Sequence, residues 1–251
     1  MFRSLTAFIA FVIFPLMFAA AAAGQAGPPL IGDDPGTPGT NHWEINIAYT
    51  VVRTPHQVTM ETPHVDLNYG LGDNIQLTYQ GGWLIGKEEG GNWSDGINNS
   101  LAGVKWRFLD EEKYGLGMST FPQLGFNTTN SLARTGVVDS GLNFFLPVEI
   151  GKTFGRIEVA AEVGYQYVEH GPDQFVAGVV VGYVLTKKIE LLLEARNALD
   201  LDLRHNNLIF DGGARVGITE HIQLLLAAGR SVESGDDSTL LYVYAGVGFT
   251  F

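Results

Sequence analysis

The sequence predicts an all-β fold: a transmembrane antiparallel up-and-down β-barrel of about twelve strands. Apolar residues alternate with small or polar residues along most of the chain. Tight turns alternate with looser loops between the alternating segments. The last segment, residues 241–251, keeps the alternation and stops on Phe251, although chain ends normally fray into water. This pattern predicts a strand whose apolar face extends to the last residue.

The first 26 residues predict a secretory signal peptide. Arg3 supplies a positive charge, residues 5–18 are mostly apolar, and small residues follow. We expect cleavage between Ala23 and Ala26. An uncleaved membrane helix is the alternative, but the apolar run is shorter than the roughly 20 residues that a spanning helix needs.

Residues 27–41 contain four of the ten prolines, interspersed with glycines. This composition predicts a flexible leader between the signal peptide and the barrel, which we assign to residues 42–251. Within the leader, Asp33 and Asp34 are interpreted as solvated charge.

About twelve segments of residues 42–251 show the alternation expected of strands. They are residues 43–51, 58–69, 75–83, 100–108, 116–124, 142–150, 157–165, 175–183, 189–195, 208–218, 222–228 and 241–251.

A local repeat marks the tight turns. Residues 68–77, 182–191 and 215–224 each end one strand, turn, and restart on Ile followed by Gln or Glu. Residues 84–96 and 126–138 are long and polar, and are expected to be loops at the opposite end. Three prolines depart from the strand pattern, and because proline removes a ladder hydrogen bond we expect bulges or strand ends there. They are Pro63, Pro122 and Pro147.

Composition excludes two classes of protein. The chain carries 15 basic and 27 acidic residues, a net charge of −12, which argues against a nucleic-acid partner. It has no cysteine, so in an exported chain no disulfide framework supports the fold.

The apolar face of the strands is expected to face lipid. The other face is rich in Gly and Ala with scattered charges, which is unlike a water-facing outer surface, and aromatic residues cluster near strand ends as in interfacial girdles. A barrel of twelve strands is also hard to fill unless its lumen holds water. A secreted β-sandwich is the alternative.

A resemblance narrows the class. The signal peptide, the hairpin strands and the terminal Phe251 resemble Gram-negative outer-membrane β-barrels, in which a final aromatic residue closes the last strand and serves as an assembly signal. The residues of this expected assembly signal are Val243, Val247, Phe249 and Phe251. Residues 34–47, 66–77 and 103–108 further resemble the transporter family named for the MetA pathway of phenol degradation.

The resemblance implies a place in the cell outer membrane. Because an even number of strands puts both ends of the barrel on one side, we expect both termini and the leader to be periplasmic. The implied partners are outer-membrane lipid, the barrel-assembly machinery and a small-molecule solute. The implied function is passive passage of small solutes, aromatic or apolar ones among them. The alternative is a closed structural or adhesive barrel that binds through its extracellular loops. The sequence leaves the solute and the oligomeric state open.

Charged residues of the non-apolar face should line the lumen. We expect there Glu44, Lys105, Arg107, Glu149, Glu158, Glu162, Glu190, Glu194, Arg196, Asp211 and Arg215. Because acids and bases fall on neighbouring strands, these residues could form a charged constriction that selects solute, or a salt-bridge network that fills the lumen. The inward Leu192, Leu225 and Phe145 could line a path for apolar solutes or pack against the leader.

Enzymatic chemistry is not expected. The six histidines show no His-x-Ser arrangement of a lipid hydrolase, and His64 with Asp66 is an isolated pair. No metal-ligand spacing occurs, and the glycines at 70 and 72 precede no helix that could hold a phosphate. We therefore expect no catalytic residue, metal site or cofactor.

Overall fold

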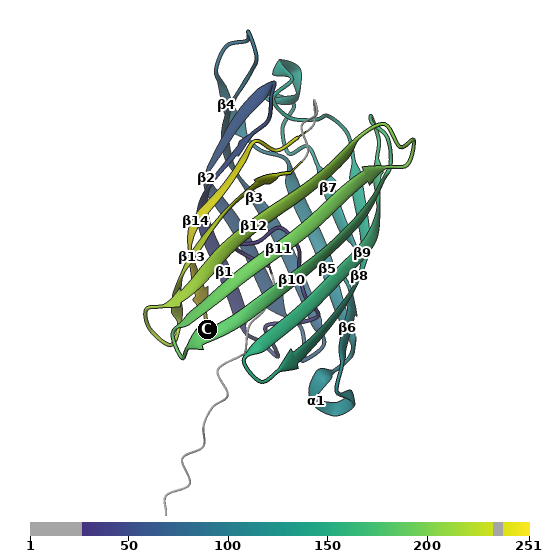
Figure 1. The fold of residues 1–251 in the computed structure, drawn as a ribbon. Coiled ribbons are helices and arrows are strands. Elements are labelled where there is room, and N and C mark those ends of the chain that lie inside the picture. Colours follow the sequence, from purple (N-terminus) through teal and green to yellow (C-terminus); the bar gives the residue numbers. More distant parts are fainter. Residues whose placement is uncertain (1–26, 233–237) are drawn as a thin grey trace, which may run out of the picture.

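The strands close into one antiparallel β-barrel (Figure 1). The computed structural model describes residues 27–232 and 238–251. Closure is made by β1 (Trp43–Arg53) and β14 (Leu241–Thr250), which pair in register from Glu44 with Thr250 to Arg53 with Leu241. The β-barrel prediction is confirmed, and the β-sandwich alternative is wrong because the sheet has no free edge. The predicted signal peptide lies outside the described residues.

Fourteen strand segments make twelve crossings of the barrel wall, as the sequence predicts. Segments β4 and β5 both pair with β3, so together they form one interrupted crossing. Segments β6 and β7 both pair with β5 on one side and β8 on the other, so they form a second interrupted crossing. The remaining bounds are β2 Gln57–Gly70, β3 Ile75–Glu88, β4 Ser94–Ile97, β5 Ser100–Leu109, β6 Gly117–Thr120, β7 Gln123–Phe126, β8 Asn143–Phe154, β9 Ile157–Val168, β10 Gln174–Thr186, β11 Ile189–Asp200, β12 Asn206–Gly217 and β13 Ile222–Ser231.

The three strand prolines have different outcomes. Pro63 lies at a register shift between β2 and β3, and Pro122 separates β6 from β7, both as expected. Pro147 instead lies inside the continuous strand β8, where it pairs with Gly164 of β9. Pro147 has no N–H to donate to a neighbouring strand. On the side away from β9 it lies opposite the interruption between β6 and β7, where no ladder hydrogen bond requires this donor.

The long loop predicted over residues 84–96 is shorter than expected. Strand β3 continues to Glu88 and β4 begins at Ser94, since the alternation resumes on both sides of the turn. Two short helical segments complete the described chain, α1 (Glu111–Tyr114) and η1 (Ala133–Thr135). In residues 27–232 and 238–251, no helix has the length and apolar character needed to cross a membrane.

The wall has an apolar outer face and a polar inner face, as the alternation predicts. Large apolar side chains that point outward are exposed, for example Trp106, Leu193 and Phe210. The residues between them are buried toward the lumen, and many are polar or charged. A wall exposed through apolar side chains is stable in lipid rather than in water.

The connections sort to the two ends of the barrel. We call the end with the shortest connections, such as residues 155–156 and 187–188, the turn end; Phe251 lies there. The opposite end, which we call the loop end, carries longer connections such as residues 127–142.

Candidate functional site

Residues 27–41 enter the barrel and occupy its lumen, where Figure 1 shows them in purple inside the ring of strands. The sequence predicted a flexible periplasmic leader. The predicted flexibility is wrong for residues 27–41, most of which are buried or half-buried among the strands, whereas their periplasmic side stays a prediction. Leu30 and Asp34 are 5% and 2% exposed. The proline and glycine content predicts only that the segment forms no helix or strand. Where the segment lies depends on its contacts with strands that are distant in sequence.

Lys105 of β5 is the main basic anchor of the leader. Its Nζ lies 2.9 Å from Asp33 Oδ1 and donates a hydrogen bond of 2.5 Å to the Asp34 carbonyl. Glu149 of β8 lies 3.6 Å away on its other side. Lys105 and Glu149 are 1% and 0% exposed, so the wall and the leader share one buried ion cluster.

Arg215 of β12 holds the beginning of the described leader. Its guanidinium donates to the carbonyls of Gly27, at 3.3 Å, and Pro28, at 3.0 Å. The same group pairs with Glu190 of β11 at 3.2 Å. The hydroxyl of Tyr242 donates to the Pro29 carbonyl at 3.0 Å. The backbone carbonyls of a segment without regular structure thus find their donors on the wall.

Glu194 of β11 accepts hydrogen bonds from the backbone N–H groups of the leader. Its two carboxylate oxygens lie 2.9 Å from Ile31 N and 2.8 Å from Gly32 N. A Cβ on Gly32 would lie 2.6 Å from one of these oxygens, so glycine permits the close approach. Asp211 of β12 is directly opposite Glu194 in the strand register.

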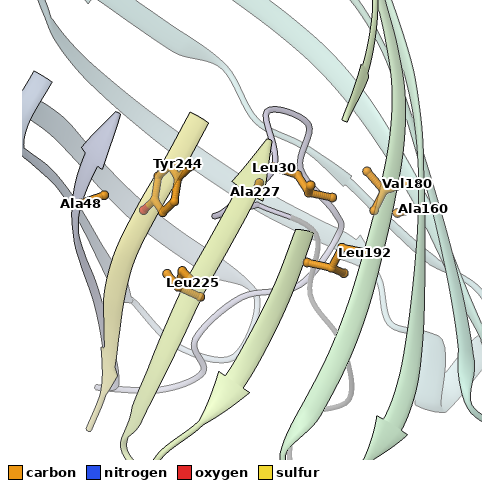
Figure 2. Packing of buried hydrophobic residues seen from close by; sticks show 8 residues of the cluster. All are labelled: Leu30, Ala48, Ala160, Val180, Leu192, Leu225, Ala227 and Tyr244. Carbon is orange, nitrogen blue, oxygen red and sulfur yellow. The ribbon is translucent and has the colours of Figure 1, made fainter. Parts of the chain in front are cut away.

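An apolar cluster surrounds Leu30 in the lumen. Figure 2 shows Leu30 on the leader with side chains from several strands around it. Leu192 and Leu225, which the sequence placed on the lumen face, are 3% and 0% exposed in this cluster. Of the two alternatives for these leucines, packing against the leader is therefore confirmed. The other members of the cluster are Ala48, Ala160, Val180, Ala227 and Tyr244.

The leader is also fixed where it leaves the barrel at the turn end. The hydroxyl of Thr37 donates to the Asp73 carbonyl at 2.8 Å, and that of Thr40 donates to the Asp73 carboxylate. This second hydrogen bond lowers the pKa of Asp73 from its usual value. A Cβ on Gly70 would lie 1.7 Å from the Gly39 carbonyl oxygen, so leader and wall touch here through their backbones.

Arg107 and Arg196 are both half-buried but lie at different levels. Arg107 is near the turn end, where it pairs with Asp110 at 3.3 Å and donates to the Asp73 carbonyl at 2.7 Å. Arg196 pairs with Glu162 across the intervening strand β10 at 3.5 Å. The structure thus distributes the predicted lumen residues along the barrel instead of gathering them in one ring.

Carboxylates dominate the remaining predicted lumen residues. Glu44 on β1 and Glu158 on β9 are half-buried, whereas Glu162, Glu194 and Asp211 are almost fully buried. Each of the four predicted basic residues already has an acidic partner. The predicted salt-bridge network is therefore present, with an excess of acidic side chains.

A polar cavity of about 40 Å³ lies between the leader and strands β1, β2, β3 and β5. This volume has room for roughly three water molecules. Asp34 lines it from the leader, and burial raises the pKa of the Asp34 carboxyl to about 7 although the Lys105 ammonium opposes the shift. The lining residues are Gly27, Pro28, Asp33, Asp34, Gly36, Glu44, Asp66, Asn68, Gln76, Gln80, Lys105 and Phe121.

Asp33, Asp34, Asp66 and Phe121 were not among the predicted lumen residues. Asp33 and Asp34 were interpreted as solvated, but Lys105 draws them into the barrel. The alternation of residues 58–69 could have placed Asp66 on the inner face. Phe121 is apolar and 3% exposed, because the break before Pro122 lets its ring turn into the lumen, where Lys105 Nζ lies 5.0 Å from the ring centroid.

The loop end is occupied by residues 127–142. Leu132 and Val137 of this loop pack against Leu84 of β3 in a second buried apolar cluster. The side chain of Gln57 on β2 donates to the Val137 carbonyl at 2.9 Å. The leader and this loop thus enter the barrel from opposite ends.

The residues of the expected assembly signal line the outer face of the closing strand. Phe249 pairs in register with Ile45 of β1 and Ile222 of β13, and Val247 and Val243 occupy equivalent positions. Phe251 is 60% exposed, and its backbone exchanges hydrogen bonds with Trp43 at 2.7 and 3.1 Å.

Metal-binding groups are not found in the part of the chain that the structure describes: no three His, Cys, Asp or Glu residues there are placed to hold a metal ion. The wall, the apolar exterior and the polar lumen together define a barrel of the outer-membrane type.

Comparison with solved structures supports this class. The fold is similar to an outer-membrane channel from Pseudomonas putida F1, with a TM-score of 0.70, 12% identity, and coverage of 88% of this chain and 100% of that one. It is also similar to the NanC porin, with a TM-score of 0.56, 9% identity, and coverage of 82% and 98%. The KdgM porin, solved with disordered oligogalacturonate, gives a TM-score of 0.54 at 10% identity, covering 82% and 99%. No protein-family model and no curated protein sequence matches the chain.

The chain therefore has the fold of outer-membrane channels and porins, and this fold supports a place in the outer membrane.

Proposed function

We propose that this protein is an outer-membrane channel for the passive passage of small solutes, narrowed by its own leader. The observation that supports it best is the polar cavity of about 40 Å³ between the leader and the wall. A channel needs a wetted path with polar groups along it, and many of the buried residues on the lumen face are polar or charged. The similar folds of a channel and two porins agree with this proposal.

Membership of the MetA-pathway phenol degradation family is part of the same proposal. It rests on the resemblance of residues 34–47, 66–77 and 103–108. Passage of aromatic or apolar solutes is proposed on this resemblance; the Phe121 ring is the apolar group that lines the cavity beside the leader. In this proposal the signal peptide is cleaved on export, and the barrel-assembly machinery inserts the barrel into the outer membrane. The turn end would then face the periplasm. No step of bond chemistry is assigned to any residue.

A closed structural or adhesive barrel is the second candidate function. It is favoured by the two segments that enter the lumen, the leader and residues 127–142. In this case the loop end would bind a partner outside the cell, and no solute would pass.

Conductance separates the two functions. Refolded protein beginning at residue 27 should give small, steady single-channel currents in a planar bilayer. The same barrel beginning at residue 42 should give several times larger currents, because the leader occupies most of the lumen at its level. Currents in neither form would reject the channel and favour the closed barrel.

A further inference from the structure

The cavity beside the leader has two carboxylates on neighbouring wall strands. Glu44 of β1 and Asp66 of β2 are linked by Asn46, whose Nδ2 lies 3.0 Å from Glu44 Oε1 and 3.1 Å from Asp66 Oδ2. Asn68 Nδ2 donates to the same Asp66 oxygen at 3.0 Å. These amides orient both carboxylates but bring no full positive charge to them.

The second oxygen of Asp66 has no partner within the described chain. Asp66 is 1% exposed, and among residues 27–232 and 238–251 no group donates a hydrogen bond to its Oδ1. Across the cavity, Asp34 is 2% exposed, and its Oδ2 likewise lacks a donor among these residues. Burying a carboxylate oxygen without a donor is costly, so a cationic donor in this cavity would be strongly favoured.

The nearby bases are already engaged. Lys105 is held by Asp33 and Glu149, and Arg215 by Glu190 and the leader carbonyls. No Lys or Arg of the described chain forms an ion pair with Glu44 or Asp66. The field in the cavity is therefore negative, and a narrow path with this field attracts cations and repels anions.

The size and remaining lining of the cavity define the ligand class. A volume of about 40 Å³ admits a group of two or three heavy atoms but no sugar ring. The amide side chain of Gln80 also lines the cavity and adds an oxygen acceptor. Because no described group of three acidic or histidine side chains can hold a metal ion, an N–H donor fits better than a bare metal cation.

We infer that this cavity binds a primary ammonium group, with Asp66 and Glu44 as its acceptors, and that it makes the channel favour cations over anions. The inference rests on the proposed channel function for the conduction preference. The binding site itself can be tested without conduction.

Binding is measured first, by equilibrium dialysis of radiolabelled methylammonium chloride against refolded protein in detergent at pH 8. We expect one saturable site. Asp66→Asn should weaken binding about tenfold, as loss of a charge-assisted hydrogen bond implies. Glu44→Gln is a second variant at a half-buried position. Glu112→Gln is the matched control, since it removes a carboxylate from the exposed face of α1 at the turn end. The heat-dependent gel shift of each variant checks that the barrel has folded.

Selectivity is measured second, as the reversal potential in a KCl gradient. A cation-selective potential that moves toward zero in Asp66→Asn, but not in Glu112→Gln, supports the inference. Saturable binding without any conductance would reject the channel function and leave the site standing. Conductance without saturable methylammonium binding, or binding unchanged in both lumen variants, would overturn the site.

Discussion

Lys105 Nζ lies 2.9 Å from the Asp33 carboxylate, and this contact joins the barrel wall to the leader. The two residues are 72 positions apart by their numbers and belong to parts of the chain with different character, a strand and an irregular segment. Because Lys105 also forms an ion pair with Glu149, the contact couples the position of the leader to the charge balance of the wall.

Replacing Lys105 with Met should release the leader. The change keeps a long unbranched side chain but leaves Asp33 and Glu149 without their cation, and breaking a buried ion pair costs about 3–5 kcal/mol. We expect hydrogen exchange at the amides of Ile31 and Gly32 to become at least about tenfold faster, and conductance to increase. Lys152→Met, on the outer face near Phe154, is the control. Unchanged exchange in Lys105→Met would show that this anchor does not hold the leader.

Gly70→Ala should displace the leader at the turn end. An added Cβ would lie 1.7 Å from the Gly39 carbonyl oxygen, a distance that only movement of the backbone can relieve. We expect the leader to become sensitive to proteases added from the turn end, with the barrel still folded. Gly217→Ala is the matched control, because the nearest atom to its added Cβ lies 3.7 Å away. A leader as resistant in Gly70→Ala as in Gly217→Ala would contradict the close packing.

Docking of the leader should weaken as pH rises. Burial raises the pKa of Asp34 to about 7, so the docked leader retains a proton that a solvated aspartic acid, with its ordinary pKa of 3.8, would release. The contribution of Asp34 to docking is therefore fully present below about pH 4 and declines up to about pH 7, by at most about tenfold per pH unit. The charged groups that act on Asp34 include Lys105, Asp33 and Arg215.

This pH dependence is measured through the protection factors of Ile31 and Gly32, corrected for intrinsic exchange at each pH. Asp34→Asn should flatten the profile between about pH 4 and pH 7. If the protection factors of Asp34→Asn fall with pH as steeply as those of the unchanged protein, a group other than Asp34 causes the pH dependence.

Deleting Phe251 should impair insertion of the barrel but not export. The deletion removes two backbone hydrogen bonds with Trp43 at the seam where β1 meets β14, together with the exposed aromatic ring. We expect outer-membrane levels to fall several-fold while the signal peptide is still removed, measured by fractionation and blotting. Phe251→Tyr, which keeps an aromatic ring, is the control. Normal levels of folded barrel after the deletion would reject the assembly role of the last residue.

The sequence by itself determined the wall of this protein. Side chains of a strand alternate between its two faces, so a lipid-facing barrel needs an apolar residue at every second position, and this need is visible in each segment separately. Interruptions such as Pro122 were equally visible, because the loss of a backbone donor is a property of the residue itself. The inward direction of Glu194 and Arg215 followed from the same alternation.

Only the tertiary structure decided what occupies the lumen. Ile31 meets Glu194 across 163 positions of sequence, and Gly27 meets Arg215 across 188, contacts that form only once the barrel has closed. A segment rich in proline and glycine carries no periodic pattern that points to a partner, so its sequence alone resembled a flexible leader. The physical reason is that periodicity reports which face of an element is buried, whereas the docking of an irregular segment depends on donors and acceptors supplied by distant strands.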